Sequence, residues 1–417
     1  MITNFTNVAF FGLARDARLI IISTAVLGIS FFGIQMLLNV LYILRLGYSV
    51  EYVGLFNASG AFTYILSSLP AAAVGNRIGL RASMVLGGVI TVLGLAILPA
   101  VEYVPATLHT SWPILSQIVL TVGWALISIN QVPALMAVTT VQNRTSAYAL
   151  NGVARGVGTF VGTIVGGFLP MIFAQLLRDH VEAPGPYRAA LWMGAGLALL
   201  GLIPLLLIRP AEPVSHSVKQ EATTPFPLWP VGLLVLHVYL SQLGPASCQF
   251  FCSAYMDTTL LLSAATIGLL TGIGQFTTIL APLLTPRLAH RYGNGWTLMT
   301  ASLGTAVSLL PLALIPHWAA AGTGRLGALA LAAIWMPALQ VFQMELVDPR
   351  WRTLTYGIVS MAMGCAYASV GFVGGRLVAT WGYATLFSLA IGMTLLGTAL
   401  MWGMLRSPRL RMLQARS

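Results

Sequence analysis

Long apolar runs separated by short polar connections dominate the chain. A helix needs about 20 apolar residues to cross a bilayer, and runs of that length are bounded here by Gly, Pro or charge. Twelve such runs can be marked, at residues 19–44, 52–74, 82–101, 112–140, 146–176, 187–208, 229–255, 262–285, 296–316, 323–347, 354–379 and 383–405. This pattern predicts an all-α integral membrane protein with twelve transmembrane helices.

The second half of the sequence repeats the first. Residues 53–66 read VGLFNASGAFTYIL and residues 267–280 read IGLLTGIGQFTTIL, with seven of fourteen positions identical at an offset of 214. A second echo, Arg144-Thr145-x-x-Tyr148 and Arg352-Thr353-x-x-Tyr356, has an offset of 208. A duplicated apolar chain predicts two pseudo-symmetric six-helix bundles, the usual plan of a secondary transporter.

One long polar connection divides the two copies. Residues 209–227 read RPAEPVSHSVKQEATTPFP and contain four prolines and the only lysine, Lys219. We therefore assign residues 1–208 to an N-terminal bundle, 209–228 to a cytoplasmic linker and 229–417 to a C-terminal bundle.

The composition makes lipid the solvent. Apolar residues make up 57% of the chain and charged residues 7%, against roughly 25% charged in a soluble domain. Spanning segments must satisfy their own backbone hydrogen bonds, which favours helices. The net charge of +11 is scattered singly and forms no patch for nucleic acid.

The basic residues predict the orientation. Fifteen of the 21 lie on the side of the termini, and two lie inside spans, Arg155 and Arg376. The four assigned to outer loops are Arg45, Arg178, Arg188 and Arg325. By the positive-inside rule, both termini are expected in the cytoplasm. We expect the protein in the plasma (inner) membrane.

Two connections carry related polar motifs. Residues 72–81 read AAVGNRIGLR and residues 286–295 read PRLAHRYGNG. Both resemble the loop signature of the major facilitator superfamily, Gly-x-x-x-Asp-Arg-x-Gly-Arg-Arg, with Asn76 and His290 at the acidic position. The resemblance implies the fold of that superfamily and a conformational switch made of Asn76, Arg77, Gly79, Arg81, His290, Arg291 and Gly293.

The fifth span carries a run of glycines. Gly158-x-x-x-Gly162-Thr163-x-x-Gly166-Gly167 resembles the antiporter signature of the same superfamily, with Thr163 at its proline position. The resemblance implies an exporter. Small residues at this spacing also predict close packing of helices, whatever the direction of transport.

Polar side chains inside the spans are the candidates for substrate contact. Gln35, Asn39 and Tyr42 share one helical face, and Gln117, Thr121, Trp124, Ser128 and Gln131 form a longer stripe. The resemblance implies that spans 1, 4, 7 and 10 line a central cavity, although such residues can also bond between helices. The candidates for substrate binding are Gln35, Asn39, Asn57, Gln117, Trp124, Arg155, Gln249, Gln275, Gln340 and Gln343.

Arg155 is the deepest charge in the first half. It lies about ten residues into its span, or ~15 Å at the rise of an α-helix, and its counterpart in the second half is Met363. Facing the cavity, it would attract an anionic or polar group. The alternative is a structural ion pair with Glu345.

These observations predict a transporter of a small organic molecule that works by alternating access in a lipid bilayer. An efflux-type antiporter is the first hypothesis, and a facilitator or uptake carrier for a neutral polar solute such as a sugar is the alternative. Protons are the candidate coupling ion, although spans 1 to 6 contain no Asp or Glu. The sequence has no HExxH, His cluster or nucleophile motif that would indicate an enzyme, and a receptor on the same fold is a further alternative. We expect a monomer without cofactor or metal.

Overall fold

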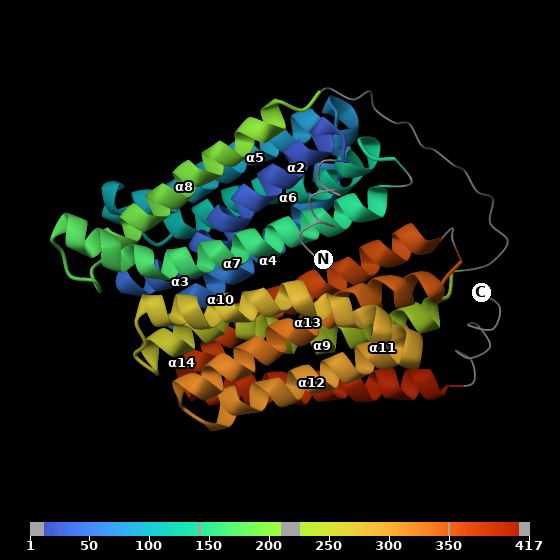
Figure 1. Cartoon of the computed structure of the whole chain (residues 1–417). Coiled ribbons are helices and arrows are strands. Elements are labelled where there is room, and N and C mark those ends of the chain that lie inside the picture. The colour runs from blue at the N-terminus through green and yellow to red at the C-terminus, as the bar shows by residue number, and fades with distance from the viewer. Residues whose placement is uncertain (1–11, 141–142, 210–225, 349–350, 408–417) are drawn as a thin grey trace. The chain divides into compact units, whose positions relative to one another are not determined.

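The computed structural model describes residues 12–140, 143–209, 226–348 and 351–407, and of residues 144–146 and 352–353 only the backbone (Figure 1). Every regular element in these ranges is helical. They are α2 (Arg15–Leu27), η1 (Gly28–Gln35), α3 (Met36–Arg45), α4 (Val50–Ile78), α5 (Leu80–Ile97), η2 (Leu98–Tyr103), η3 (Ala106–Leu108), α6 (Trp112–Ala137), α7 (Arg144–Leu177), α8 (Pro184–Leu206), α9 (Leu228–Thr258), α10 (Ala264–Leu280), η4 (Ala281–Leu284), α11 (Thr285–Tyr292), α12 (Asn294–Leu314), α13 (Trp318–Glu345) and α14 (Arg352–Arg406).

The helices follow the predicted spans closely, which confirms an all-α membrane fold. Within the described ranges, ten helices are long and apolar enough to cross a membrane. The first is continuous from α2 through the π-helical η1 to α3. The last, α14, contains both final spans, which Gly382 separates with φ 81° and ψ 172°. In addition, α4 extends for 29 residues over the second predicted span.

The chain forms two compact units that do not coincide with the two halves of the sequence. The first contains Met1–Tyr48, Ser59–Ser215 and Ser263–Gly272, and the second contains Ser49–Ala58, His216–Leu262 and Ile273–Ser417. The first turns of α4 thus pack with the second unit, and those of α10 with the first. The predicted linker lies almost wholly outside the described residues, and the predicted bundle boundaries stay predictions.

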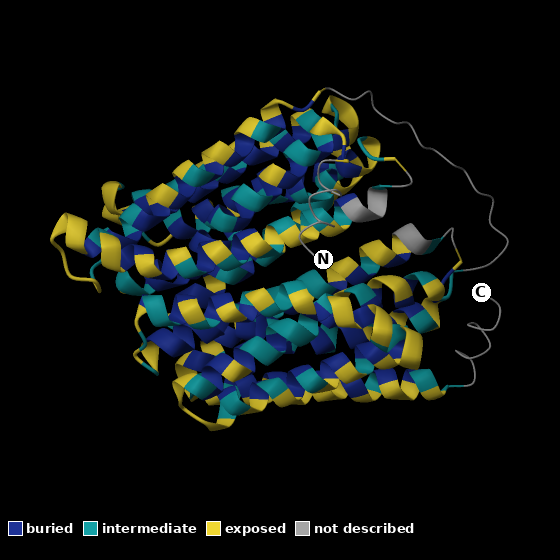
Figure 2. Cartoon of the chain, in the orientation of Figure 1, coloured by how far each residue is buried: buried dark blue, intermediate teal, exposed yellow. Residues whose placement is uncertain are grey.

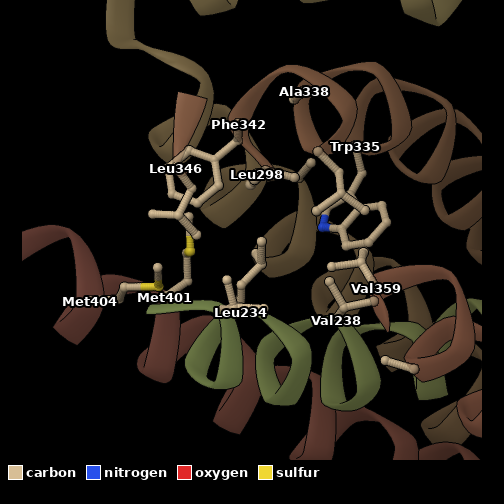
Figure 3. Packing of buried hydrophobic residues seen from close by; sticks show 14 of the residues in the cluster. Leu234, Val238, Leu298, Trp335, Ala338, Phe342, Leu346, Val359, Met401 and Met404 are labelled. Carbon is tan, nitrogen blue, oxygen red and sulfur yellow. The ribbon is translucent and has the colours of Figure 1, made fainter. Parts of the chain in front are cut away.

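The second unit has a buried core on α9, α12, α13 and α14 (Figure 3). Leu234, Leu298, Phe342 and Met401 are each at most 1% exposed, and Trp335 is 2% exposed. Because lipid tails are as apolar as these side chains, close packing rather than water exclusion holds such helices together.

The lipid-facing side of a helix is visible on α12. Leu303, Val307, Leu310 and Leu314 are exposed at intervals of three or four residues, and exposed and buried positions alternate along the helix in Figure 2. An exposed apolar stripe of this period would be unfavourable in water but is the normal surface of a membrane helix.

Ion pairs fasten the ends of helices in the first unit. Arg45 pairs with Glu182 at 2.5 Å, and Arg188 pairs with Glu102, which also accepts a hydrogen bond from the Tyr42 hydroxyl (3.1 Å). Pairing at partly exposed sites adds modestly to stability, by about 1 kcal/mol or less each.

The assignment of Arg325 to an outer loop was wrong. It lies inside α13, is 4% exposed, and donates a hydrogen bond from Nη1 to Ser253 Oγ of α9 at 3.0 Å. The helix begins at Trp318, so Arg325 lies well beyond its start instead of at the edge of the predicted span, and burial there requires such a bond.

Candidate functional site

The glycines of α7 pack this helix directly against the first span. A Cβ at Gly162 would overlap the backbone of Ile29, one at Gly158 would lie 3.1 Å from the Gly28 Cα, and one at Gly166 would lie 3.1 Å from the Ile34 Cα. Only residues without side chains allow backbones to approach this closely. The predicted packing role of Gly158, Gly162 and Gly166 thus has a direct structural counterpart.

Gly167 faces a different helix. A Cβ there would lie 2.8 Å from the Ala264 oxygen and 2.9 Å from the Gly268 Cα, both on α10. This contact lies within the first unit, because that unit contains residues 263–272. Gly167 therefore joins α7 to the beginning of α10.

The second unit repeats this contact with the equivalent residues. A Cβ at Gly54 of α4 would lie 2.9 Å from the Gly375 Cα of α14. Gly54 and Gly268 are related by the offset of 214, and Gly167 and Gly375 by the offset of 208. The Gly167–Gly268 and Gly54–Gly375 contacts are thus pseudo-symmetric copies, which we call the two glycine crossings.

An ion pair accompanies only one crossing. Arg376 Nε lies 3.3 Å from Glu51 Oε1 in the second unit, and both side chains are at least half exposed. The repeat offsets place Phe168 and Ala265 at the corresponding positions of the first unit. This pair therefore breaks the symmetry of the two crossings.

The two loop signatures have the same backbone geometry. Gly79 (φ 90°) lies between α4 and α5, and Gly293 (φ 86°) lies between α11 and α12. A left-handed φ of this kind is strained for any residue with a Cβ. Each glycine nitrogen also donates to the carbonyl four residues earlier, Gly75 (3.0 Å) or Ala289 (2.8 Å).

The side chains of the predicted switch divide into exposed and bound ones. Asn76, Arg77, His290 and Arg291 are exposed. Arg81 instead donates from Nη2 to the Leu206 oxygen at 2.6 Å, where a cation satisfies the end of α8. Arg81 thus connects the beginning of α5 to the end of α8. The switching role of all seven residues stays a prediction.

A groove of about 880 Å³ lies beside the second loop signature. Tyr292, Trp296, Glu345 and Arg406 are among its lining residues, and Asn294 Nδ2 donates to Glu345 Oε1 at 3.1 Å. The carboxylate proposed from the sequence as a partner for Arg155 is therefore hydrogen-bonded inside its own unit.

A polar network joins three helices of the first unit. Gln131 Nε2 on α6 donates to Thr24 Oγ1 on α2 (2.6 Å), and that hydroxyl lies 2.8 Å from Asn151 Oδ1 on α7. One turn from Gln131, the Ser128 hydroxyl lies 3.3 Å from that of Tyr64 on α4. The stripe predicted on the fourth span thus bonds directly to α2 and α4, and through Thr24 to α7.

Arg155 lies one turn after Asn151 on α7, and its side chain is exposed. Tyr64 interacts with its guanidinium electrostatically. The ion pairs found in the described part of the chain leave Arg155 without a carboxylate partner. A cation in a membrane span without a carboxylate partner is a candidate for contact with a ligand.

The other candidates in the first unit differ in their surroundings. Gln35 is fully buried and donates to the Leu191 oxygen of α8 at 2.9 Å, and Asn39 is also buried. Gln117 lies against Gly60 of α4. Trp124 is partly exposed and packs against Phe31 and Phe32. The structure therefore groups Trp124 with aromatic residues and directs Gln35 toward a neighbouring helix.

The candidates in the second unit do not form one cluster. Gln340 is exposed, whereas Gln343 on the same helix is 1% exposed. Asn57, Gln249 and Gln275 are partly buried on three different helices. Substrate contact by these residues stays a prediction.

Asn130 is a buried polar residue that the sequence pattern does not single out. It is 2% exposed, and its Nδ2 lies within 3.0 Å of the Ala71 oxygen, Ser83 Oγ and the Leu126 oxygen. It thereby connects α6 with α4 and α5 next to the first loop signature. An asparagine three residues after Ile127 is ordinary in a helix, so nothing in the sequence distinguishes Asn130 from its neighbours.

We expect Asn130→Ala to lower stability by about 1–3 kcal/mol, because it leaves buried acceptors without their donor. The measurement is thermal unfolding of the purified variant in detergent. Gln117→Ala serves as the control on the same helix, because the Oε1 of this amide has no hydrogen-bond partner among the described residues. An unchanged melting temperature for Asn130→Ala would contradict the bridging role.

Comparisons with known proteins agree with this architecture. The family model described as Major Facilitator Superfamily matches residues 20–261 and 240–416. No curated protein sequence matches the chain.

Solved structures match over nearly the whole chain. A mutant of the nucleoside transporter NupG aligns with 94% of this chain and 100% of its own, with a TM-score of 0.74 and 14% identity. A D-xylose-proton symporter aligns with 96% of this chain and 97% of its own, with a TM-score of 0.72 and 19% identity. A POT family transporter in complex with 5-aminolevulinic acid aligns with 96% of this chain and 98% of its own, with a TM-score of 0.70 and 15% identity. At these identities the likeness establishes the fold.

Proposed function

Because the chain belongs to the major facilitator superfamily, it is a multi-pass secondary transporter and not an enzyme, and we propose that it is an efflux-type antiporter for a small organic molecule. The arginine distribution supports cytoplasmic termini, and the plasma (inner) membrane is the proposed location. Protons are the proposed counter-ion, and a monomer is the proposed working state.

The observation that carries this proposal is the pair of glycine crossings. Each crossing joins the first turns of one helix, α4 or α10, to a unit that does not contain the rest of that helix. Backbone contacts without side chains can separate and close again at little steric cost. Contacts of this kind are compatible with the rigid-body movements of alternating access, and their pseudo-symmetry supports a common role.

Export is supported by the glycine face of α7. Its residues resemble an antiporter signature, and three of them bind α7 tightly to the first span through Gly28, Ile29 and Ile34. A rigid α7 would hold Arg155 and Gly167 at fixed positions on one helix. This arrangement favours a common movement of the polar site and the crossing.

Asp257 is the proposed proton-exchanging group. It lies in α9 and is 7% exposed, the one carboxylate among the buried residues in the described part of the chain. It is the penultimate residue of α9, and a buried acid in a membrane segment is a common element of proton-coupled transport.

The function is tested by flux in proteoliposomes. Vesicles containing purified protein are loaded with radiolabelled organic solutes, and efflux is followed with and without an imposed pH gradient. We expect saturable efflux that accelerates about tenfold when the gradient drives protons inward, and Asp257→Asn should remove that acceleration. Glu345→Gln, an exposed acid bonded to Asn294, should keep it.

A facilitator for a neutral polar solute is the second candidate. Asn39 Oδ1, Asn57 Nδ2 and Gln117 Oε1 have no hydrogen-bond partner among the described residues, and amides of this kind could bind hydroxyl groups. Saturable flux that ignores the pH gradient, with a preference for sugars, would favour this candidate over the antiporter.

A further inference from the structure

A cation and an aromatic cluster belong to neighbouring helices of the first unit, Arg155 to α7 and the aromatic residues to α6 and η1. We propose that Arg155 and the aromatic group of Phe31, Phe32 and Trp124 form a binding site for an organic monocarboxylate with an apolar body. This inference rests on the proposed function, since it names the class of molecule that the transporter carries.

Arg155 lies on the side of α7 that faces protein, not on the side that faces lipid. It shares a helical face with Gly158 and Gly162, three and seven residues later, and both pack against the first span. Val153 and Val157 lie on the opposite face and are 43% and 44% exposed, as lipid-facing residues should be. The exposed part of Arg155 therefore lies on the protein-facing side of α7, beside the first span.

The hydrogen-bond network shows which residues of neighbouring helices lie at the same position along the helix axes. Gln131, Thr24 and Asn151 are in contact and define one level. Arg155 lies four residues beyond Asn151, or about 6 Å along α7. Trp124 lies seven residues before Gln131, or about 10 Å along α6. Consecutive spans run in opposite directions, so both lie on the same side of the network, about one helical turn apart in height.

The aromatic group supplies an apolar wall. The Trp124 ring lies 5.3 Å from that of Phe31 and 4.9 Å from that of Phe32, measured between centroids. Trp124 and Phe32 are partly exposed, so their faces remain available to a ligand. An apolar body against these rings would gain the contact energy that aromatic side chains usually provide.

The charge of the site selects the head group. Guanidinium binds a carboxylate through two parallel hydrogen bonds, and the hydroxyl pair of Tyr64 and Ser128 lies at the level of Arg155 as a further donor. One positive charge balances one carboxylate, whereas a phosphate dianion would keep an uncompensated charge in the membrane. The site thus fits a monocarboxylate better than a phosphate.

Binding to purified protein in detergent tests the site without any transport step. The probes are benzoate, 2-naphthoate and octanoate, each compared with its neutral amide by isothermal titration calorimetry. We expect at least one acid to bind about tenfold more tightly than its amide. Arg155→Gln should weaken binding of the acid by about ten- to a hundredfold and leave binding of the amide nearly unchanged. Arg155→Lys should keep part of the preference, because it retains the charge but not the paired donors.

Arg406→Gln is the matched control, since Arg406 is an exposed arginine at the end of α14 that stacks on Trp402 at 4.0 Å. It should bind like the unmodified protein. The inference is overturned if no acid binds better than its amide, or if Arg155→Gln keeps that preference. If the acid binds through Arg155 but pH-driven efflux fails, the antiporter proposal fails and the binding site stands. If pH-driven efflux survives Arg155→Gln unchanged, the antiporter proposal stands and the binding site at Arg155 is overturned.

Discussion

Gly162→Leu is expected to remove most of the folded protein from the membrane. A Cβ at this position would already overlap the backbone of Ile29, and leucine adds three more carbon atoms. Neither backbone can yield without separating α7 from the first span along the whole glycine face. Overpacking of this kind costs about 1–3 kcal/mol where side chains can adjust, and more where the obstacle is a backbone.

The matched control is Gly152→Leu on the same helix. Nothing lies within 4 Å of a Cβ at Gly152, and leucine forms helix better than glycine. This variant should fold as well as the unmodified protein. Membrane-extracted yield and thermal unfolding of both variants provide the comparison, and equal yields would show that α7 is not held by its glycine face.

Gly268→Leu and Gly54→Leu are expected to lose transport by about tenfold or more, and to fold better than Gly162→Leu because each obstructs a single crossing and not the whole glycine face of α7. Each leucine would stand at a glycine crossing, against Gly167 in one unit and against Gly375 in the other. A crossing that cannot close would hold the protein in one state of its cycle. Because the two contacts are pseudo-symmetric copies, the two variants should show similar losses.

The control for this pair is Gly392→Leu on α14, where nothing lies within 4 Å of a Cβ. Flux in proteoliposomes is measured together with thermal unfolding, which separates a blocked cycle from a misfolded protein. Full transport by Gly268→Leu would mean that the crossings take no part in alternating access. A large loss in only one of the two variants would mean that the repeat does not act symmetrically.

The sequence predicted the fold well because a membrane leaves few alternatives. A run of about 20 apolar residues that must satisfy its own backbone becomes a helix, so the spans could be read from hydropathy alone. Gly79 and Gly293 were also readable, since a turn between two helices often requires a positive φ. Even Gly382, which separates the last two spans, marks a break that the run lengths required.

The polar contacts were not readable in the same way. Gln35 and Gln131 look alike in sequence, yet one donates to the α8 backbone and the other to Thr24. Asn130 gave no signal, although it bonds to two other helices. Arg325 was placed in a loop because a charge near a span boundary usually lies outside it. Each of these outcomes depends on which helix is the neighbour.

The repeat shows the same division. By itself the sequence determined that two copies exist, that both are helical membrane bundles, and that Gly54 corresponds to Gly268 and Gly167 to Gly375. Only the tertiary structure decided that these four glycines meet as two crossings, and that Glu51 and Arg376 pair beside one of them. Hydropathy and periodicity are local properties of the chain. Contact between helices more than 90 residues apart depends on packing that no local pattern records.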